Sequence, residues 1–206
     1  MLDLLAVSAP VGSSGSWRPL EVTLVIQEDV IPWHYSATRE LQFGEWLRQD
    51  LLNGVFEPPV QDHDLAILLT KARQHSIALV GISAETLFEP IPPHDFYTAL
   101  SDTIAQGDTE ASWKGDERNV VLALARIWYS ASTGQIAPKD VAAAWVLNYL
   151  PLEHQLVLST ARSAYLGLEQ NNPVIDGERM TAFIQFAKSV IEQLLIKKEI
   201  SCNPAE

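Results

Sequence analysis

The chain has 206 residues, of which 47% are hydrophobic and 19% are charged. This composition belongs to a folded globular protein and excludes an intrinsically disordered one, and the length suffices for one medium domain or two small ones. The net charge of −12 at pH 7 argues against a nucleic-acid partner, because binding to phosphates requires a basic face. An acidic surface instead suits a cationic ligand.

The sequence shows no targeting signal. No apolar run approaches the ~20 residues that a membrane-spanning helix requires, and the N-terminus has neither the basic region nor the cleavage site of a secretory signal. Cys202 is the single cysteine, so it cannot form an internal disulfide. These features predict a cytoplasmic protein without a membrane partner.

The N-terminal part of the chain predicts one strand between helical segments. Residues 2–9 have the pattern of the end of a helix, and a Gly/Ser loop follows. Between residues 19 and 27 hydrophobic side chains alternate with period two, which predicts a strand. Glu21 then lies on one face, and the apolar face carries Leu20, Val22, Leu24 and Ile26. Residues 39–53 are predicted to be helical and to end at a Gly54 cap, with an apolar stripe made of Phe43, Trp46, Leu47 and Leu51.

A proline-rich segment divides the chain. A second helix is predicted at about 62–75, and the later segment Glu89-Pro90-Ile91-Pro92-Pro93 cannot continue a helix and makes a stiff extended connection. We therefore expect one domain in residues 1–91 and another in residues 92–206. The second domain is predicted to be all helical, because apolar residues keep helical spacing over residues 94–105, 116–133, 138–149, 153–168 and 177–198.

A single clear strand cannot form a sheet, since its backbone groups would lack partners. We therefore expect the N-terminal domain to be incomplete, with few strands and an unpaired sheet edge.

Several segments carry a resemblance to a known family. They are the strand from Leu20 to Ile26, Phe43-Gly44-Glu45-Trp46, Gly115-Asp116-Glu117-Arg118-Asn119 before the run 120–129, and Lys139-Asp140. Together they resemble the aminoglycoside (3'')(9) adenylyltransferases, which inactivate streptomycin and spectinomycin. The resemblance implies an α+β, mostly helical fold: an incomplete nucleotidyltransferase-type α/β domain followed by an all-α helical bundle. It also implies ATP and Mg²⁺ as cofactors, a small-molecule antibiotic as partner, and a monomer.

The metal site of the resembled family precedes the strand that carries Glu21. Its Gly-Ser and Asp-x-Asp motifs have no counterpart here, so we expect a truncated, inactive chain whose magnesium ligands lie upstream. Gly12-Ser13 and Gly15-Ser16 are better explained as loop residues. Asp62-His63-Asp64 has the spacing of the metal motif but opens a predicted helix, where carboxylates are favoured by the helix dipole and by capping.

Transfer of AMP to a hydroxyl requires a base that removes the proton of that hydroxyl. The resemblance assigns this role to Glu21. Judged by periodicity alone, Glu21 is more simply a carboxylate on the solvated face of an edge strand. The surrounding residues align without a gap as far as Trp46 and beyond, which favours the catalytic interpretation.

Lys139 opens a predicted helix directly after Pro138. A lysine there opposes the positive end of the helix dipole, which is unfavourable unless an anion lies nearby. The resemblance makes Lys139 a contact of the ATP phosphates, with Arg126 and Tyr165 as further nucleotide contacts. The alternative is an exposed lysine offset by Asp140, and the residues alone do not decide between the two.

For the antibiotic, the resemblance assigns Trp46 and Asp116 to the binding pocket. A carboxylate and an aromatic wall suit an aminocyclitol with ammonium groups, although Trp46 alone predicts a core residue and Asp116 a helix cap. Members that act on both drugs carry a tryptophan and an aspartate at the positions of Gly107 and Ser112. We therefore expect spectinomycin as the substrate and doubt streptomycin.

Three hypotheses follow for the whole chain. The first is an aminoglycoside adenylyltransferase that confers antibiotic resistance. The second is a non-catalytic protein that binds drug and nucleotide. The third is an unrelated helical interaction module whose acidic and aromatic residues are structural.

Overall fold

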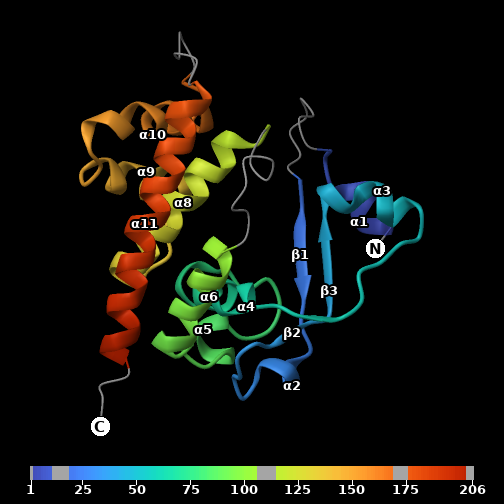
Figure 1. Cartoon of the computed structure of the whole chain (residues 1–206). Coiled ribbons are helices and arrows are strands. Elements are labelled where there is room, and N and C mark those ends of the chain that lie inside the picture. Colours follow the sequence, from blue (N-terminus) through green and yellow to red (C-terminus); the bar gives the residue numbers. More distant parts are fainter. Residues whose placement is uncertain (1, 11–18, 106–114, 169–175, 203–206) are drawn as a thin grey trace.

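Among the described residues, strands occur in the N-terminal part of the chain and the C-terminal part is helical (Figure 1). The computed structural model describes residues 2–10, 19–105, 115–168 and 176–202. The N-terminal elements are α1 (Leu2–Val7), β1 (Glu21–Leu24), α2 (Gln27–Val30), β2 (Thr38–Arg39), β3 (Leu41–Gly44), the 3-10 helix η1 (Glu45–Leu47), α3 (Arg48–Leu52), β4 (Val60–Gln61), α4 (Asp64–His75) and α5 (Ala84–Leu87). The C-terminal elements are α6 (Pro93–Ala105), α8 (Glu117–Thr133), α9 (Lys139–Leu147), α10 (Leu152–Tyr165) and α11 (Gly177–Cys202).

The strands form two antiparallel pairs within the described ranges. β1 pairs with β3, and this register places Glu21 opposite Gly44. β2 pairs with β4, with Thr38 opposite Gln61. The predicted α+β, mostly helical fold class is confirmed.

The predicted helix over residues 39–53 is wrong. This segment contains the end of β2, all of β3, η1 and α3. Phe43 and Leu51 have helical spacing, yet they reach one buried cluster from a strand and from a helix. Pairing with β1 gives the backbone of β3 the hydrogen bonds that a helix would have made locally. Trp46, which the same pattern predicted to be a core residue, is 61% exposed.

Only part of the apolar face predicted for the first strand is buried. Val22 packs against the cluster that contains Leu5, Phe43 and Leu51. The other residues of the predicted apolar face remain exposed: Leu20, Leu24 and Ile26. The strand itself covers only Glu21–Leu24. Periodicity therefore located the strand but overstated its length and its burial.

Every helix predicted beyond Pro93 is present, and together these helices enclose one core. α8 contacts α6, α9, α10 and α11, and Figure 1 shows α11 as the long helix that crosses the bundle beside it. Several side chains of this core are almost completely buried: Leu100, Leu122, Leu158, Phe183 and Ile191. None of the helices in the described ranges is long and apolar enough to span a membrane.

The two parts of the chain meet through α4 and α6, which pack against each other. Residues 89–92 form neither helix nor strand, as their prolines predicted. Polar contacts cross the connection: Trp33 Nε1 donates to Asp95 at 2.8 Å, and the Tyr35 hydroxyl donates to Asp102 at 2.7 Å. The division into domains near residue 91 stays a prediction, because the contacts across it are substantial.

Candidate active site

The three residues predicted to contact a nucleotide line a single cavity of about 610 Å³. Arg126 lies in the middle of α8, Lys139 begins α9, and Tyr165 ends α10. The mutual packing of α8, α9 and α10 brings these positions together although they are far apart in sequence. Lys71 and His75 of α4, one turn apart, line the same cavity.

The cavity is electropositive. Its lining includes Lys71, Arg126 and Lys139 and contains no carboxylate. Neither Lys71 nor Arg126 makes a hydrogen bond or salt bridge to another described residue. Burial first, and then the charge of Arg126, lower the pKa of Lys139 from its ordinary value, while Asp116 opposes this shift. Gathered cations with few partners are unfavourable unless an anion neutralises them, so the cavity suits a phosphate-bearing ligand.

His75 fixes the wall of this cavity that is formed by Ile136. Its Nε2 lies 3.0 Å from the Ile136 carbonyl oxygen, and because a carbonyl only accepts hydrogen bonds, Nε2 is the donor. Gln74 Oε1 accepts the Ile136 N–H at 3.0 Å. Both backbone groups of Ile136 are therefore held by α4, immediately before the segment that leads to Lys139.

Asn119 connects the predicted drug carboxylate to the predicted phosphate contact. Its Nδ2 donates to Asp116 Oδ1 at 2.6 Å, and Lys139 Nζ donates to its Oδ1 at 3.2 Å. Asp116 occupies the N-cap position of α8, but its side chain makes no capping hydrogen bond to the helix backbone. Asp116 therefore occupies the capping position of α8, but its carboxylate is not used for capping. Its exposed carboxylate keeps acceptor sites for a ligand.

Glu21 lies at the beginning of β1 with an exposed side chain. Gln42 Nε2, on the neighbouring strand, is 3.5 Å from Glu21 Oε1. The carboxylate is thus accessible to a substrate hydroxyl. The alternative of a solvated edge carboxylate describes the same exposure, so accessibility alone does not distinguish the two interpretations.

Trp46 lies in η1, directly after β3. Its six-membered ring covers Gly44, since a Cβ added there would lie 2.3 Å from Cη2. Because Gly44 is the register partner of Glu21, the indole lies beside the strand position that carries the carboxylate. The proposed core role of Trp46 is wrong, because the side chain is exposed and free to face a ligand.

The predicted site residues form two groups. Glu21 and Trp46 belong to the β1–β3 pair, whereas Asp116 and the cavity residues belong to the helices. No hydrogen bond or ion pair between described residues joins the groups. Figure 1 draws the beginnings of β1 and α8 at the same end of the view. That Glu21 and Asp116 share one cleft stays a prediction.

The described residues show no cluster of metal ligands. No group of three or more His, Cys, Asp or Glu side chains in those ranges gathers to hold a metal ion. Asp62 is engaged otherwise, since Arg39 Nε donates to its Oδ2 at 2.7 Å and the Asp64 N–H donates to its Oδ1 at 2.9 Å. These contacts agree with the structural interpretation of Asp62 and Asp64. The segments around Gly12, Gly15, Gly107 and Ser112 lie outside the described residues.

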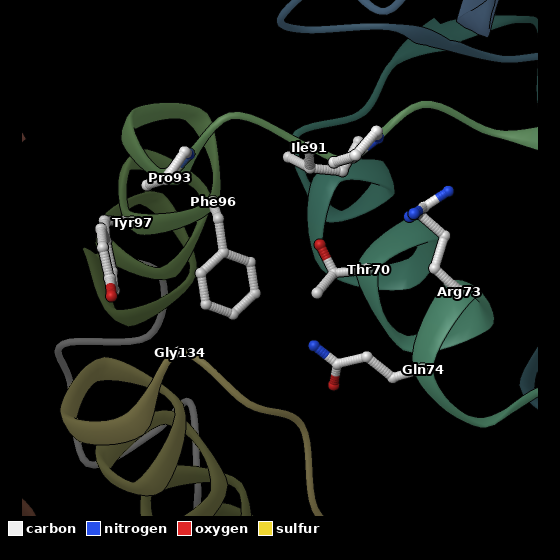
Figure 2. Close-up of a pocket in the computed structure, with 9 residues that line it drawn as sticks. Thr70, Arg73, Gln74, Ile91, Pro93, Phe96, Tyr97 and Gly134 are labelled. Carbon is white, nitrogen blue, oxygen red and sulfur yellow. The ribbon is translucent and has the colours of Figure 1, made fainter. Parts of the chain in front are cut away.

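Figure 2 shows a smaller cavity of about 230 Å³ between α4, α6 and Gly134. Its polar groups are already engaged in part: Arg73 Nη1 donates to the Glu85 carbonyl at 2.6 Å, and Gln74 holds Ile136. None of the predicted site residues lines this cavity. It therefore lies outside the candidate active site.

Sequence reasoning missed Lys71, His75, Asn119 and Gly44. The spacing of Lys71 and His75 places them on one face of α4, but nothing in the sequence shows that this face turns toward α8 and α9. Asn119 follows Asp116 by three residues, so helical spacing could have indicated their contact. No sequence pattern indicates the role of Gly44, because it depends on the pairing of β1 with β3.

Comparisons with known proteins agree with these features. The family described as aminoglycoside adenylyltransferase, C-terminal domain, matches residues 86–190. An aminoglycoside (3'') (9) adenylyltransferase from Escherichia coli is 52% identical over 195 residues, which is 95% of this chain and 74% of the relative. A relative of the same name from Rhizobium radiobacter is 53% identical over 189 residues, or 92% of this chain and 70% of the relative.

Proteins named for spectinomycin alone are also similar. A spectinomycin 9-adenylyltransferase from Staphylococcus aureus is 39% identical over 192 residues, covering 93% of this chain and 73% of the relative. The crystal structure of a spectinomycin adenyltransferase from Enterococcus faecialis, with ATP and spectinomycin, matches with a TM-score of 0.79 and 28% identity. The match covers 91% of this chain and 74% of that chain.

Proposed function

Because the chain belongs to the aminoglycoside adenylyltransferase family, we propose that it transfers AMP from ATP to a hydroxyl of spectinomycin and so confers resistance. The observation that carries the proposal is the electropositive cavity lined by Arg126, Lys139 and Tyr165, joined through Asn119 to the exposed carboxylate of Asp116. A phosphate-binding cavity beside an acidic group is what the transfer of a nucleotide to a cationic drug requires.

The nucleotide occupies the cavity in this proposal. Arg126 and Lys139 bind the phosphates, where their charges offset the negative charge that develops on the leaving pyrophosphate. Tyr165 contacts the nucleotide from the end of α10. Lys71 adds a third cation from α4, a role supported by its place in the lining and by its lack of another partner among the described residues.

The antibiotic lies between Asp116 and Trp46. Spectinomycin carries ammonium groups, for which a carboxylate is a charge-assisted acceptor and an indole face an attractive surface. The exposure of both side chains supports this assignment. Streptomycin is expected to be the poorer substrate, because Gly107 and Ser112 offer neither an aromatic wall nor a carboxylate.

Glu21 acts as the base. Its carboxylate accepts the proton of the spectinomycin hydroxyl while the hydroxyl oxygen attacks the α-phosphorus of ATP. A phosphorus–oxygen bond forms to the drug, the bond to the β-phosphate oxygen breaks, and pyrophosphate leaves with the electron pair. General-base assistance of this kind contributes ~10²–10⁴ in rate.

Magnesium is the ion that would neutralise the triphosphate. The described residues contain no group of three or more His, Cys, Asp or Glu side chains that could hold it. The protein is proposed to act as a cytoplasmic monomer.

Two measurements together distinguish an adenylyltransferase from a non-catalytic binding protein. Calorimetry measures binding of spectinomycin and ATP to the 206-residue chain, and mass spectrometry measures AMP transfer by a fusion that adds the part of the Escherichia coli relative outside the match. We expect the chain to bind both ligands and the fusion to form AMP-spectinomycin. Binding without transfer by the fusion would support the non-catalytic alternative, and absence of binding would refute the proposal.

A further inference from the structure

Gly44 is the position that makes room for the Trp46 indole. A Cβ built on Gly44 would lie 2.3 Å from Cη2, 2.4 Å from Cζ3 and 2.6 Å from Cζ2 of Trp46, and real Cβ atoms essentially never come closer than 3.0 Å to another atom. The backbone of Gly44 is extended, with φ of −161° and ψ of 158°, which any residue adopts. Glycine therefore supplies space here and not a special backbone conformation, and a larger side chain would displace the exposed indole.

The register of the strands shows which face the indole occupies. Residues directly opposite in an antiparallel pair project their Cβ atoms to the same face, so the missing side chain of Gly44 would lie beside that of Glu21. Gln42, two residues earlier, is on the same face and approaches Glu21. The other face carries Val22 and Phe43, which pack in the buried cluster. The indole thus stands next to the proposed base, on the accessible side.

Glu45, which precedes Trp46, is held in place by an ion pair with Arg48. The Glu45 side chain is only 2% exposed, and Arg48 binds it in a bidentate manner, Nε to Oε2 at 2.7 Å and Nη2 to Oε1 at 2.9 Å. The Ser8 hydroxyl also donates to Glu45. These hydrogen bonds, with that of Arg48 foremost, hold the pKa of Glu45 below its ordinary value. Glu45 therefore stays ionised and paired at neutral pH.

Arg48 connects this ion pair to the first helix. Its Nη2 donates to the carbonyl oxygens of Leu5 at 3.2 Å and Ser8 at 3.0 Å, at the end of α1. Glu45 and Arg48 are three residues apart, so their ion pair spans the turn of the chain that contains Trp46. Since Glu45 points inward and its neighbour Trp46 is exposed, the ion pair determines the direction in which the indole leaves the chain.

We propose that Gly44 and the Glu45–Arg48 pair are positioning residues for the antibiotic, because they hold the Trp46 indole over Gly44 and beside the strand position of Glu21. The proposal rests on the proposed function, in which Trp46 forms the aromatic wall of the drug site. An aromatic wall held in this place orients the drug hydroxyl toward Glu21. Loss of either support releases the indole without removing any atom that touches the drug.

The first measurement follows the indole itself. Fluorine-labelled tryptophan gives one NMR signal for each tryptophan, and Trp46→Phe identifies the signal of Trp46. Gly44→Ala is expected to shift and sharpen that signal alone, since an exposed ring is the group that yields to the new methyl. The thermal unfolding midpoint should change little. An unaltered Trp46 signal in Gly44→Ala would overturn the inference and leave the proposed function standing.

The second measurement is a double-mutant cycle on spectinomycin affinity. Gly44→Ala should weaken binding about tenfold, the scale of one lost aromatic contact, and leave ATP affinity unchanged. In a Trp46→Ala background the same change should have no effect, because Gly44 acts only through the indole. An equal loss in both backgrounds would overturn the inference. Absence of spectinomycin binding by the unmodified chain would instead refute the proposed function, and the role of Gly44 toward the antibiotic with it.

Glu45→Gln provides an independent variant. It keeps the shape of the side chain but removes the charge that Arg48 binds, so it should weaken spectinomycin binding and alter the Trp46 signal in the same direction as Gly44→Ala. In the active fusion both variants should raise KM for spectinomycin and leave KM for ATP unchanged. An equal rise in both KM values would indicate a general structural defect and contradict positioning.

Discussion

The helical part and the strand part of this chain bury their hydrophobic residues differently. Beyond Pro93, one continuous cluster joins α6, α8, α9, α10 and α11. Before it, burial is divided between a cluster around Leu65 and another around Phe43. Large hydrophobic side chains after α4 remain open to solvent, including Ile77 at 84%, Leu79 at 92% and Val80 at 94% exposure. The helical part is therefore expected to be the more stable one.

The proposed site includes residues from both parts. The helical part supplies the proposed nucleotide contacts, and the strand part supplies Glu21 and Trp46. The phosphate-binding side chains extend from helices whose positions the large core fixes. The proposed base and the proposed aromatic wall are on β1 and η1, where a small cluster and the Glu45–Arg48 pair support them. ATP binding should consequently tolerate changes in the strand part, whereas drug binding and turnover should not.

The largest effect is expected for Glu21→Gln in the active fusion. Turnover should fall by ~10²–10⁴, because the amide cannot accept the hydroxyl proton. Binding of ATP should stay the same, since its contacts lie on the helices. Steady-state kinetics and calorimetry check the two halves of this prediction. A variant that retains full kcat would remove Glu21 from the role of base.

Two matched core substitutions test the difference in packing. Phe43 and Phe183 are both 0% exposed, but they lie in the small and the large cluster. Phe183→Ala should lower the free energy of unfolding by ~3–5 kcal/mol, and Phe43→Ala by less, because a small cluster relaxes around a cavity more easily. Denaturant unfolding followed by circular dichroism measures both. Equal losses would contradict the expected difference in packing between the two clusters.

Lys139→Met should separate ligand binding from stability. ATP affinity is expected to fall by about ten- to a hundredfold, the range for a hydrogen bond to a charged group. The ligand-free protein should instead become slightly more stable, because burial and Arg126 disfavour the charged form of Lys139. Calorimetry and thermal unfolding of the same sample measure the two quantities.

The pH dependence of this effect has a definite sign. Since the pKa of Lys139 is lower in the folded state than in the unfolded state, the unfolded state binds more protons in the interval between the two values. The free energy of unfolding contributed by Lys139 therefore rises as pH rises through that interval below the ordinary lysine range. The difference in stability between Lys139→Met and the unmodified chain should shrink there. A stability difference between the two proteins that does not change with pH would contradict a lowered pKa of Lys139.

The smallest effect is expected for Lys71→Met, at most about tenfold on ATP affinity, because this exposed lysine acts from the rim of the cavity. Its influence should be larger for ATP than for AMP, since it acts on the phosphates. Lys197→Met on α11 serves as the control, and it should change neither affinity. Equal weakening of AMP and ATP by Lys71→Met would show that the side chain does not contact the additional phosphates.

The sequence by itself determined the helical part. Apolar residues at helical spacing located α4 and each described helix from α6 onward, because such a stripe is stable only when it is buried against a neighbour. The short helix α5 was not predicted. The order of the helices beyond Pro93 and the connection at Pro90–Pro93 also followed from local rules. The roles of Glu21, Asp116 and Lys139 came from the family resemblance, since no spacing rule predicts catalysis.

Only the tertiary structure decided what the strand part does. The stripe of Phe43, Leu47 and Leu51 has the spacing of a helix, yet pairing with β1 divides it among β3, η1 and α3. That pairing places Gly44 opposite Glu21, and Trp46, which was predicted to be a core residue, is exposed. Likewise, Lys71 joins Arg126 and Lys139 in one cavity through the packing of α4 near α8 and α9. The local sequence pattern indicates which residues favour burial. Contacts between distant segments decide which of these residues are buried and which charged side chains lie together.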